Sequence, residues 1–351
     1  KNWILPLVVL FLLSGCANKK QGRPDLASYV NPFIGTGGHG HTFPGATMPF
    51  GMVQLSPDTR LDGWDGCSGY HYSDSVVYGF SHTHLSGTGV SDYGDVLLMP
   101  TTGELRLNNG ATRGVENGYA SRFDKETEQA EPGFYNCYLL DYNIDVALTT
   151  SLRAGIHKYQ YNEDGARHVV VDLKHRDQLI SSSLKKFSDN AVGGSRISKA
   201  WAVEQHIYFY IEFSEPFDKH TEDEQVHGFT FVDDLEEMFV KVGISAVSVE
   251  NAKANLEAEI PHWDFEKTKT DARAAWNKQL SKIEVKGEHD DKVKFYTSLY
   301  HTMIAPNLFS DVNGDYRGMD MKIHNTNGGK EQYTVFSLWD TFRATHPLFT
   351  I

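Results

Sequence analysis

Short runs of apolar residues that alternate with polar ones dominate the middle of the chain, from about residue 76 to residue 249. The runs are rich in β-branched and aromatic residues, and turn signals such as Asn-Glu-Asp-Gly at residues 162–165 separate them. A period of two with this enrichment is typical of half-buried strands. Seven strands are predicted, at residues 93–99, 135–139, 144–149, 157–161, 168–173, 207–213 and 237–244. Many short strands at regular spacing indicate a β-sandwich.

The hydrophobic period changes after residue 250. Ala252, Leu256 and Ile260 recur at helical spacing, and residues 272–282 have the composition of a second helix. Three further segments are predicted to be a helix, a polar hairpin-like stretch and a last helix, at residues 290–304, 309–333 and 338–349. The apolar faces of these last helices have no evident partner in the chain. We therefore expect deletion of residues 288–351 to improve solubility.

The first residues have the pattern of a bacterial lipoprotein signal. A basic residue precedes an apolar stretch at residues 3–13, which is too short to span a bilayer. Leu-Ser-Gly-Cys at residues 13–16 then predicts cleavage before Cys16 and lipidation of its sulfur. An ordinary secretory signal is the alternative, but it needs no cysteine at that place. We predict a signal peptide at residues 1–15, a polar tether at 16–27, and lipid anchoring to the bacterial cell envelope (outer membrane, periplasmic or surface face).

The composition excludes one class of partner. The chain has 33 basic and 46 acidic residues, a formal net charge of −13, and no basic run, so nucleic-acid binding is not expected. Aromatic residues make up 12% of the chain, which favours β-structure and sugar-type sites. Besides Cys16 only Cys67 and Cys137 are present, and no Cys-x-x-Cys motif occurs. We predict two free or buried thiols, although a disulfide between them stays open.

Residues 30–60 combine dense Gly and Pro with large apolar side chains. Gly and Pro at this density forbid a helix and favour tight turns. A solvated linker would lack the aromatic residues. The pattern therefore predicts an ordered, buried loop system that shapes a concave site and ends in a short strand at residues 51–55. A packed, turn-rich beginning of a sandwich fits the pattern equally well.

Two more segments, residues 63–72 and 79–89, place flat aromatic rings beside polar groups. Trp64 offers a ring face, while Asp65, His82 and His84 offer hydrogen-bonding atoms. A sugar needs both, because its C–H face stacks on rings and its hydroxyls need directional partners. Structural histidines are the alternative. The His-x-His pairs at residues 39/41 and 82/84 also have a spacing that zinc accepts on a strand, but neither pair lies in a clear strand pattern.

These segments resemble the N-terminal domain of the glycoside hydrolase family 92 α-mannosidases, and Phe-Ser-Leu-Trp-Asp-Thr-Phe-Arg at residues 336–343 extends the match. The resemblance implies a calcium-dependent, inverting exo-enzyme that removes terminal α-linked mannose, with α-1,2 as the expected linkage, from mannose-containing glycans. It also implies an N-terminal β-sandwich (supersandwich) at residues 28–250, a helical linker at 251–287, and the first helices of a truncated (α/α)6 toroid at 288–351.

The resemblance also assigns roles to residues. The catalytic acid and base and most ligands of the Ca²⁺ cofactor are expected beyond Ile351, so this chain alone is expected to be inactive. Trp64 resembles the aromatic residue on the leaving-group side, and Asp340 is expected to accept two adjacent sugar hydroxyls. The alternative for Asp340 is a charge favoured at a helix N-terminus. The residues expected to contact substrate are Trp64, Asp65, His82, His84, Trp339, Asp340 and Arg343.

Two other functions stay open. A non-catalytic sugar-binding lipoprotein is expected if the chain naturally ends at Ile351. A histidine-rich metal hydrolase is the third and more distant hypothesis, and the sequence identifies no metal ligands for it.

Overall fold

The structure is a computed structural model that describes residues 24–334 and 338–351. The signal peptide and the lipidation at Cys16 lie outside these residues, so both stay predictions. In the part of the chain that the structure describes, no helix is both long and apolar enough to cross a membrane.

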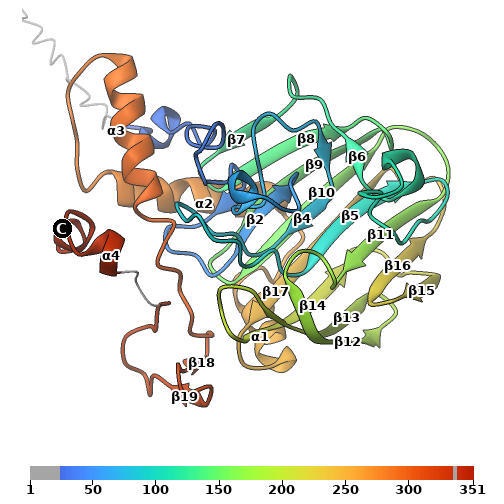
Figure 1. Ribbon diagram of the computed structural model, residues 1–351. Helices are drawn as coiled ribbons and strands as arrows, with labels where there is room; N and C mark the ends of the chain where they lie inside the picture. The colour runs from blue at the N-terminus through green and yellow to red at the C-terminus, as the bar shows by residue number, and fades with distance from the viewer. Residues whose placement is uncertain (1–23, 335–337) are drawn as a thin grey trace, which may run out of the picture.

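Two antiparallel sheets lie face to face and form the body of the molecule (Figure 1). The seven-stranded sheet contains, in spatial order, β1 (Ala46–Thr47), β2 (Gln54–Asp58), β4 (Gly79–Ser81), β5 (Leu97–Thr102), β11 (Arg167–Asp172), β16 (Val226–Phe231) and β15 (Lys219–Asp223). The eight-stranded sheet contains β12 (Gln178–Ser188), β13 (Ala191–Lys199), β14 (Gln205–Phe213), β17 (Glu237–Ser245), β10 (Ala154–Tyr161), β9 (Ile144–Thr150), β8 (Phe134–Leu139) and β7 (Gln129–Glu131). Two short strands, β3 (Val76–Val77) and β6 (Ser121–Arg122), pair with each other beside the sheets.

One hydrophobic core fills the space between the two sheets. Strand β11 contributes Val169 and Val171, and strand β17 contributes Val240 and Val242, all without exposed surface. Residues two apart on a strand point to the same side, so the alternation in the sequence predicts β17, whereas β11 is buried along its whole length and its run of valines predicts it. All seven predicted strands are confirmed by an overlapping observed strand. Strand β5 begins at Leu97 rather than at residue 93, because Val96 has a φ of +57°, a left-handed conformation that cannot continue a strand.

Two long strands, β12 and β13, were not predicted from the sequence pattern. Strand β12 lies at the edge of its sheet and is exposed along most of its length, so its residues do not alternate between apolar and polar. Strand β13 contains Gly193 and Gly194, which carry no hydrophobic signal. Gly194 is required there, because a Cβ atom at this position would lie 1.8 Å from the carbonyl oxygen of Ser183 on β12. The short strand expected at residues 51–55 is displaced toward the C-terminus, as β2.

Helices α1 (Val249–Glu259) and α2 (Phe265–Leu280) follow the last strand and confirm the helical period after residue 250. Side-chain caps begin both helices: Ser248 accepts a hydrogen bond from the backbone N–H of Asn251, and Asp264 accepts one from that of Lys267. Helix α1 lies directly against β17, since a Cβ atom at Gly243 would be 2.2 Å from the carbonyl oxygen of Ala252.

Helix α3 (His289–His301) confirms the amphipathic helix expected at residues 290–304. Contrary to the expectation from the sequence, its apolar face packs against other parts of the chain. Tyr296 and Tyr300 are buried in a second hydrophobic core with Phe43 of the N-terminal loops and Trp276 of α2. The short 3-10 helix η1 (Leu26–Tyr29) completes this core. The indole N–H of Trp276 donates a hydrogen bond of 2.7 Å to the backbone oxygen of Thr47, which fastens α2 to strand β1 of the sandwich.

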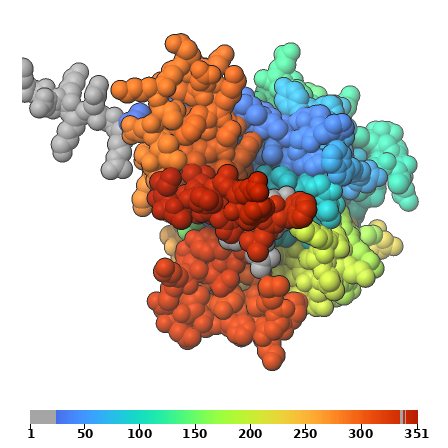
Figure 2. All heavy atoms as spheres, turned by 60° about the vertical axis from the view of Figure 1, so that its left-hand side comes forward, coloured from blue at the N-terminus to red at the C-terminus, as the bar shows by residue number. Residues whose placement is uncertain are grey.

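The last part of the chain forms small elements on the surface. Strands β18 (Asp315–Arg317) and β19 (Ile323–Asn325) make the hairpin expected between residues 309 and 333. The prediction of a single helix at residues 338–349 is wrong, because two short helices, α4 (Leu338–Thr341) and α5 (Thr345–Leu348), form there. Ala344 between them has a φ of +59°, and in a continuous helix Pro347 would clash with the carbonyl group of Arg343. Figure 2 shows these red residues lying across the surface beside the orange helices.

Candidate functional site

Three loops that are distant in sequence converge around Trp64. The indole ring meets the imidazole of His41 edge-on, with ring centroids 4.4 Å apart, and that of His39 at 5.4 Å. His39 Nδ1 lies 2.9 Å from Asp65 Oδ1, and the hydrogen bond from His39 lowers the pKa of the Asp65 carboxyl. Trp64 keeps 58% of its surface exposed although neighbours fix its ring. An ordered, exposed aromatic face beside an ionised carboxylate is suited to a polyhydroxylated ligand.

The third loop, residues 84–91, packs closely on the indole at Gly89. A Cβ atom at Gly89 would lie 2.7 Å from Trp64 Nε1. The backbone N–H of Gly87 donates a hydrogen bond of 2.6 Å to the oxygen of His41, and Cys67 Sγ donates one of 2.7 Å to the oxygen of Thr88. These contacts fix the orientation of Trp64 before any ligand arrives.

A buried carboxylate supports this surface from beneath. Asp58, at the end of β2, has no exposed surface; Ser81 Oγ donates a hydrogen bond of 2.5 Å to it, and the ring nitrogens of His84 and His175 lie 3.3 and 3.2 Å away. Burial opposes ionisation, but the imidazoles of His84 and His175 outweigh it and hold the pKa of Asp58 well below its usual value. Gly69 of the Trp64 loop sits directly above, where a Cβ atom would be 2.6 Å from Asp58 Oδ1.

Arg176 ties the loops to this buried centre. Its Nη1 lies 3.8 Å from Asp58 Oδ1. Its Nη2 donates hydrogen bonds to the backbone oxygen of Gly66 at 2.6 Å and to Ser91 Oγ at 2.9 Å. One guanidinium group therefore joins the Trp64 loop, the 84–91 loop and the buried carboxylate.

Beside the aromatic cluster lie buried polar atoms without a protein partner. His41 Nε2, Thr42 Oγ1 and His301 Nε2 are shielded from solvent and have no hydrogen-bond partner among the described residues. His41 Nε2 is 3.7 Å from Asp65 Oδ1, which is too long for a hydrogen bond. A Cβ atom built on Gly35 would contact both Thr42 and His301, so the end of α3 reaches the same place as the N-terminal loops. Burial lowers the pKa of His301 to about 4, so its ring is neutral at pH 7.

Unpartnered buried polar atoms cost about 1–3 kcal/mol each, and they mark where a ligand hydroxyl or a water is expected to bind. The sequence pattern did not identify His301 as a site residue. A single histidine at the end of an amphipathic helix carries no signal of its own, and only the packing of α3 on the loops reveals it.

His82 and His84 are not placed for direct ligand contact. His82 has no exposed surface: its Nδ1–H donates to the oxygen of Val96 at 2.7 Å, and its Nε2 lies 3.1 Å from His157 Nε2. His84 Nδ1 hydrogen-bonds the backbone oxygen of Gln54 at 2.9 Å, and only 3% of the residue is exposed. The predicted contact of these two histidines with sugar is therefore not supported by their burial, and the alternative of structural histidines describes them.

The C-terminal residues expected at the site lie on short helix α4 and just after it. Trp339 is 90% exposed, and the guanidinium of Arg343 lies over the ring of Phe342 at 5.2 Å. The backbone of Asp340 belongs to α4, while its side chain lies outside what the structure describes. Among the described residues, no hydrogen bond, ion pair or ring contact joins Trp64 or Asp65 to Trp339 or Arg343.

A separate cavity of about 590 Å³ lies between the sandwich and the β18–β19 hairpin. Tyr93 and His206 line it from the sandwich side, and Phe309 and Tyr316 line it from the other. Its volume is in the range of small-molecule sites. At its wall His206 Nε2 hydrogen-bonds Glu204 at 2.6 Å, while His206 Nδ1 is buried without a hydrogen-bond partner among the described residues.

The structure also shows the state of the two cysteines and where possible cation ligands lie. Cys67 and Cys137 are free and buried, as predicted, and burial raises the pKa of both thiols. Among the described residues, one group has the spacing of a metal site: His220, Glu222 and His227, far from Trp64 in sequence. Neither histidine pair proposed from the sequence belongs to it.

Comparison with known proteins follows the same division of the chain. Residues 29–251 match the glycosyl hydrolase family 92 N-terminal domain, and residues 251–351 match the glycosyl hydrolase family 92 catalytic domain. The family GH92 α-mannosidase BT3965 from Bacteroides thetaiotaomicron is similar in structure, with a TM-score of 0.87 and 35% identity, over 93% of this chain and 47% of that one. BT3965 has also been solved in complex with mannoimidazole.

Two further proteins are similar to this chain. The family GH92 inverting mannosidase BT2199 from Bacteroides thetaiotaomicron VPI-5482 has a TM-score of 0.81 and 28% identity, over 93% of this chain and 46% of that one. An uncharacterized secreted glycosidase from Arthroderma benhamiae is 25% identical over 88% of this chain and 45% of its own length. The chain thus spans about half the length of the relatives it matches.

Proposed function

Because the chain belongs to glycoside hydrolase family 92, we propose that it supplies the sugar-contacting N-terminal part of an enzyme that removes terminal α-linked mannose from glycans. The observation that carries this proposal is the ordered, exposed indole of Trp64 beside an ionised carboxylate and unpartnered buried polar atoms. The similarity to solved α-mannosidases supports mannose as the sugar, and α-1,2 is the linkage proposed.

Each part of the site has a role in this proposal. Trp64 packs against the sugar that is released, and Asp65 accepts hydrogen bonds from its hydroxyls. His301 is neutral at pH 7, so its Nε2 exchanges one hydrogen bond with the ligand. Asp340, with Trp339 and Arg343 beside it, binds hydroxyls of the terminal mannose. Asp58 and Arg176 touch no ligand and hold the loops in place.

The chemical step is assigned to the rest of the enzyme. An inverting glycosidase needs an acid and a base about 6.5–9.5 Å apart with a water between them. We propose that these carboxylates belong to an (α/α)6 domain of which α3 is the first helix, since the chain covers 47% of the length of the similar α-mannosidase. The expected product of hydrolysis is β-mannose, and NMR of the first product formed tests that inversion.

Calcium is proposed for the complete enzyme only. Calcium prefers six to eight oxygen ligands, whereas the one metal-like group among the described residues contains two histidines. The oxygen-rich turn around Asp311 does not fit either, because Ser245, Asn251 and Asn255 already donate hydrogen bonds to that carboxylate. We therefore propose that most of the calcium ligands lie beyond Ile351, and no step is derived through the ion.

Lipid anchoring at Cys16 completes the proposal for location in the bacterial cell envelope, and the similarity to a secreted glycosidase supports export. The change Cys16→Ala is expected to release the protein from the membrane fraction or to leave an unprocessed precursor. If the Cys16→Ala protein partitions with membranes as the parent does, the anchor is not at this residue.

The function is tested on the full-length enzyme with an α-1,2-mannobioside and an aryl α-mannoside. Trp64→Ala is expected to lower kcat/KM for the mannobioside by about 2–12-fold, from about 0.5–1.5 kcal/mol of lost stacking, and to change the aryl substrate less. Trp201→Ala is the matched control, since Trp201 is exposed to the same 58% but lies outside the cluster. Asp340→Asn is expected to lower kcat/KM for both substrates by about 13–160-fold, from about 1.5–3 kcal/mol of lost charged hydrogen bonding.

Two results would change the proposal. If Trp64→Ala and Asp340→Asn keep the parental kcat/KM on both substrates, this part of the enzyme is scaffold and the site is wrong. If the full-length protein binds mannosides but releases no mannose, the alternative of a non-catalytic carbohydrate-binding lipoprotein replaces the enzyme.

A further inference from the structure

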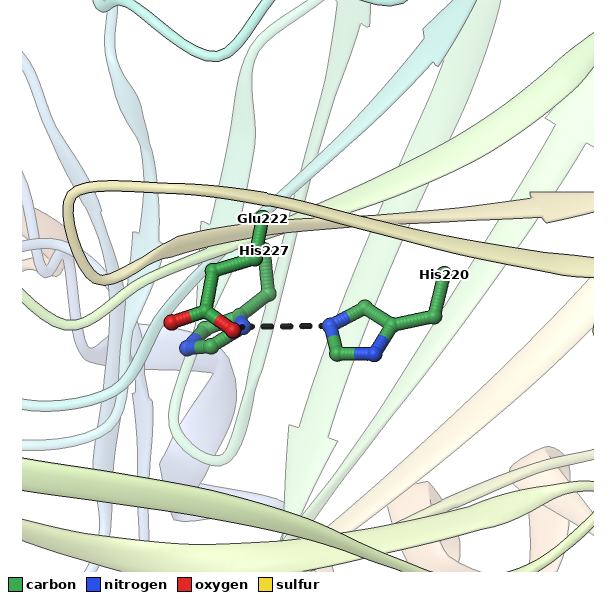
Figure 3. Close-up of side chains that lie close together, drawn as sticks. All are labelled: His220, Glu222 and His227. Carbon is green, nitrogen blue, oxygen red and sulfur yellow. Dashed lines mark hydrogen bonds and ion pairs between the residues drawn. The ribbon is translucent and has the colours of Figure 1, made fainter.

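We propose that the β15–β16 hairpin carries a binding site for a divalent transition metal of the zinc class, held by His220, Glu222 and His227. One ligand atom from each of the three residues lies within 4.8 Å of the others (Figure 3). Figure 1 shows β15 and β16 on the far side of the sheets from α3, and none of the three residues belongs to the candidate carbohydrate site around Trp64. The metal site is therefore independent of the proposed glycosidase function.

The backbone of the hairpin brings these residues together. His220 and Glu222 are two apart on β15, so their side chains point to the same face of the sheet. Glu222 is paired directly with His227 on β16, and His220 is paired with Phe229. Residues directly opposite on antiparallel strands have Cβ atoms about 4.5–5.5 Å apart. The three ligands need no loop rearrangement to meet, since strand register alone places them.

The distances are close to those between the ligands of a tetrahedral metal site. His220 Nε2 lies 3.1 Å from His227 Nδ1, and Glu222 Oε2 lies 3.8 Å from the same His227 nitrogen. In a tetrahedral site with Zn–N bonds of about 2.0–2.1 Å, two ligand nitrogens are about 3.3–3.4 Å apart. Small side-chain movements therefore complete the site. The donor set of two imidazoles and one carboxylate suits zinc and its neighbours in the transition series, and not calcium or magnesium.

The facing ring nitrogens of His220 and His227 lie within hydrogen-bonding distance of each other, so they do not both carry a proton. Without a metal, two neutral rings can share one N–H between their facing nitrogens. When a metal binds, that proton moves to the outer nitrogen of its own ring, and both inner nitrogens become ligands.

The protein holds two of the ligands rigidly and leaves one side accessible. His227 is only 3% exposed, and the ring of His220 stacks on Phe229 with centroids 4.7 Å apart and planes inclined by 7°. The Glu222 side chain is 53% exposed, so an ion reaches the site from solvent and a water takes the fourth position. Because β15 is the edge strand of its sheet, the metal would fasten that edge to β16.

The test is metal binding to the full-length, tag-free protein after treatment with a chelator. Co²⁺ is titrated and followed by the visible absorption bands of four-coordinate cobalt, and Zn²⁺ is titrated by calorimetry. The parent is expected to bind one ion, and Zn²⁺ is expected to raise its melting temperature. His220→Ala and Glu222→Gln each remove one exposed ligand and are expected to weaken binding by more than about tenfold.

Glu224→Gln is the matched control. It removes the same charge from the same hairpin, but Glu224 pairs with Lys174 at 2.7 Å and does not belong to the cluster. Its affinity for Co²⁺ is expected to equal that of the parent. His227→Ala is informative only where the variant folds, so the two exposed positions decide the result. A parent that binds no Co²⁺, or variants at residues 220 and 222 that bind it as the parent does, would overturn the site.

Discussion

At the scale of single residues, Asp58 carries a negative charge although it has no exposed surface. The imidazoles of His84 and His175 and the guanidinium group of Arg176 lie next to its carboxylate and stabilise that charge. Asp58→Asn keeps the shape of the side chain and removes the charge. We expect the free energy of unfolding to fall by about 3–5 kcal/mol, because the guanidinium group of Arg176 stays buried without its counter-charge. Urea denaturation measures this, with Asp189→Asn as the control: Asp189 is exposed, so its change is expected to leave stability unaltered. An Asp58→Asn protein as stable as the parent would show that the carboxylate does not organise the site.

The pH dependence of stability is also set by single residues in the core. The pKa of His82 is lowered by burial to about 4, and burial lowers that of His157 well below its usual value. A chain of hydrogen bonds keeps both neutral, from Tyr159 O–H to His157 and from His157 to His82. Below pH 6.5 the unfolded chain binds protons that the folded protein excludes, so stability is full above that pH and falls as the pH drops toward 4.

For His82 alone this loss is on the order of 3 kcal/mol, since each pKa unit is worth about 1.4 kcal/mol. His82→Gln removes the titrating group and is expected to flatten the curve of unfolding free energy between pH 6.5 and pH 4. Equal slopes for the variant and the parent across this range would mean that His82 does not contribute to the acid sensitivity.

At the scale of elements, helix α2 connects the sandwich to α3. Trp276 is fully buried, its N–H donates to the oxygen of Thr47, and its ring centroid lies 4.5 Å from that of Tyr300 on α3. Trp276→Ala is expected to lower the free energy of unfolding by about 3–5 kcal/mol, because it leaves a cavity and an unpaired carbonyl. Trp201→Ala, at an exposed tryptophan, is expected to stay within about 0.5 kcal/mol of the parent. Similar losses for both variants would show that α2 is not the connecting element.

Elements also show what the sequence could predict. Strands with one buried face and one polar face carry a period of two, and β8, β9, β10, β14 and β17 appear where that period is found. Strand β11 is buried along its whole length, and its run of β-branched residues predicts it instead. Strand β12 lies exposed at a sheet edge and lacks the period, so it could not be found in that way. The helix expected at residues 338–349 failed for a local reason, since the pattern of apolar residues does not register the interruption at Ala344 and Pro347.

Only part of the candidate site could be predicted from the sequence, because the rest depends on how distant segments pack in the whole molecule. Trp64 and Asp65 stand out because aromatic and acidic residues between glycines are rare in a core. The histidines give no such signal: His82 lies in the core and His301 reaches the site from a helix more than 200 residues later. Whether a histidine is structural depends on packing between distant segments, and the residues next to it in the sequence do not indicate that packing.

The whole molecule decides how the chain responds to shortening, and here the structure reverses the expectation from the sequence. Helix α3 covers Phe43, Trp276 and Leu280 in the second hydrophobic core. Deleting residues 288–351 would uncover them, so we expect less soluble protein, a lower melting temperature and stronger binding of a hydrophobic dye. Deleting only residues 338–351 removes the 90% exposed Trp339 together with Leu348 and Phe349, which pack on this core and on Phe50, and is expected to lower the melting temperature less than the longer deletion does. If the longer deletion is the more soluble and melts as the parent does, α3 is not part of the core and the sequence-based expectation was correct.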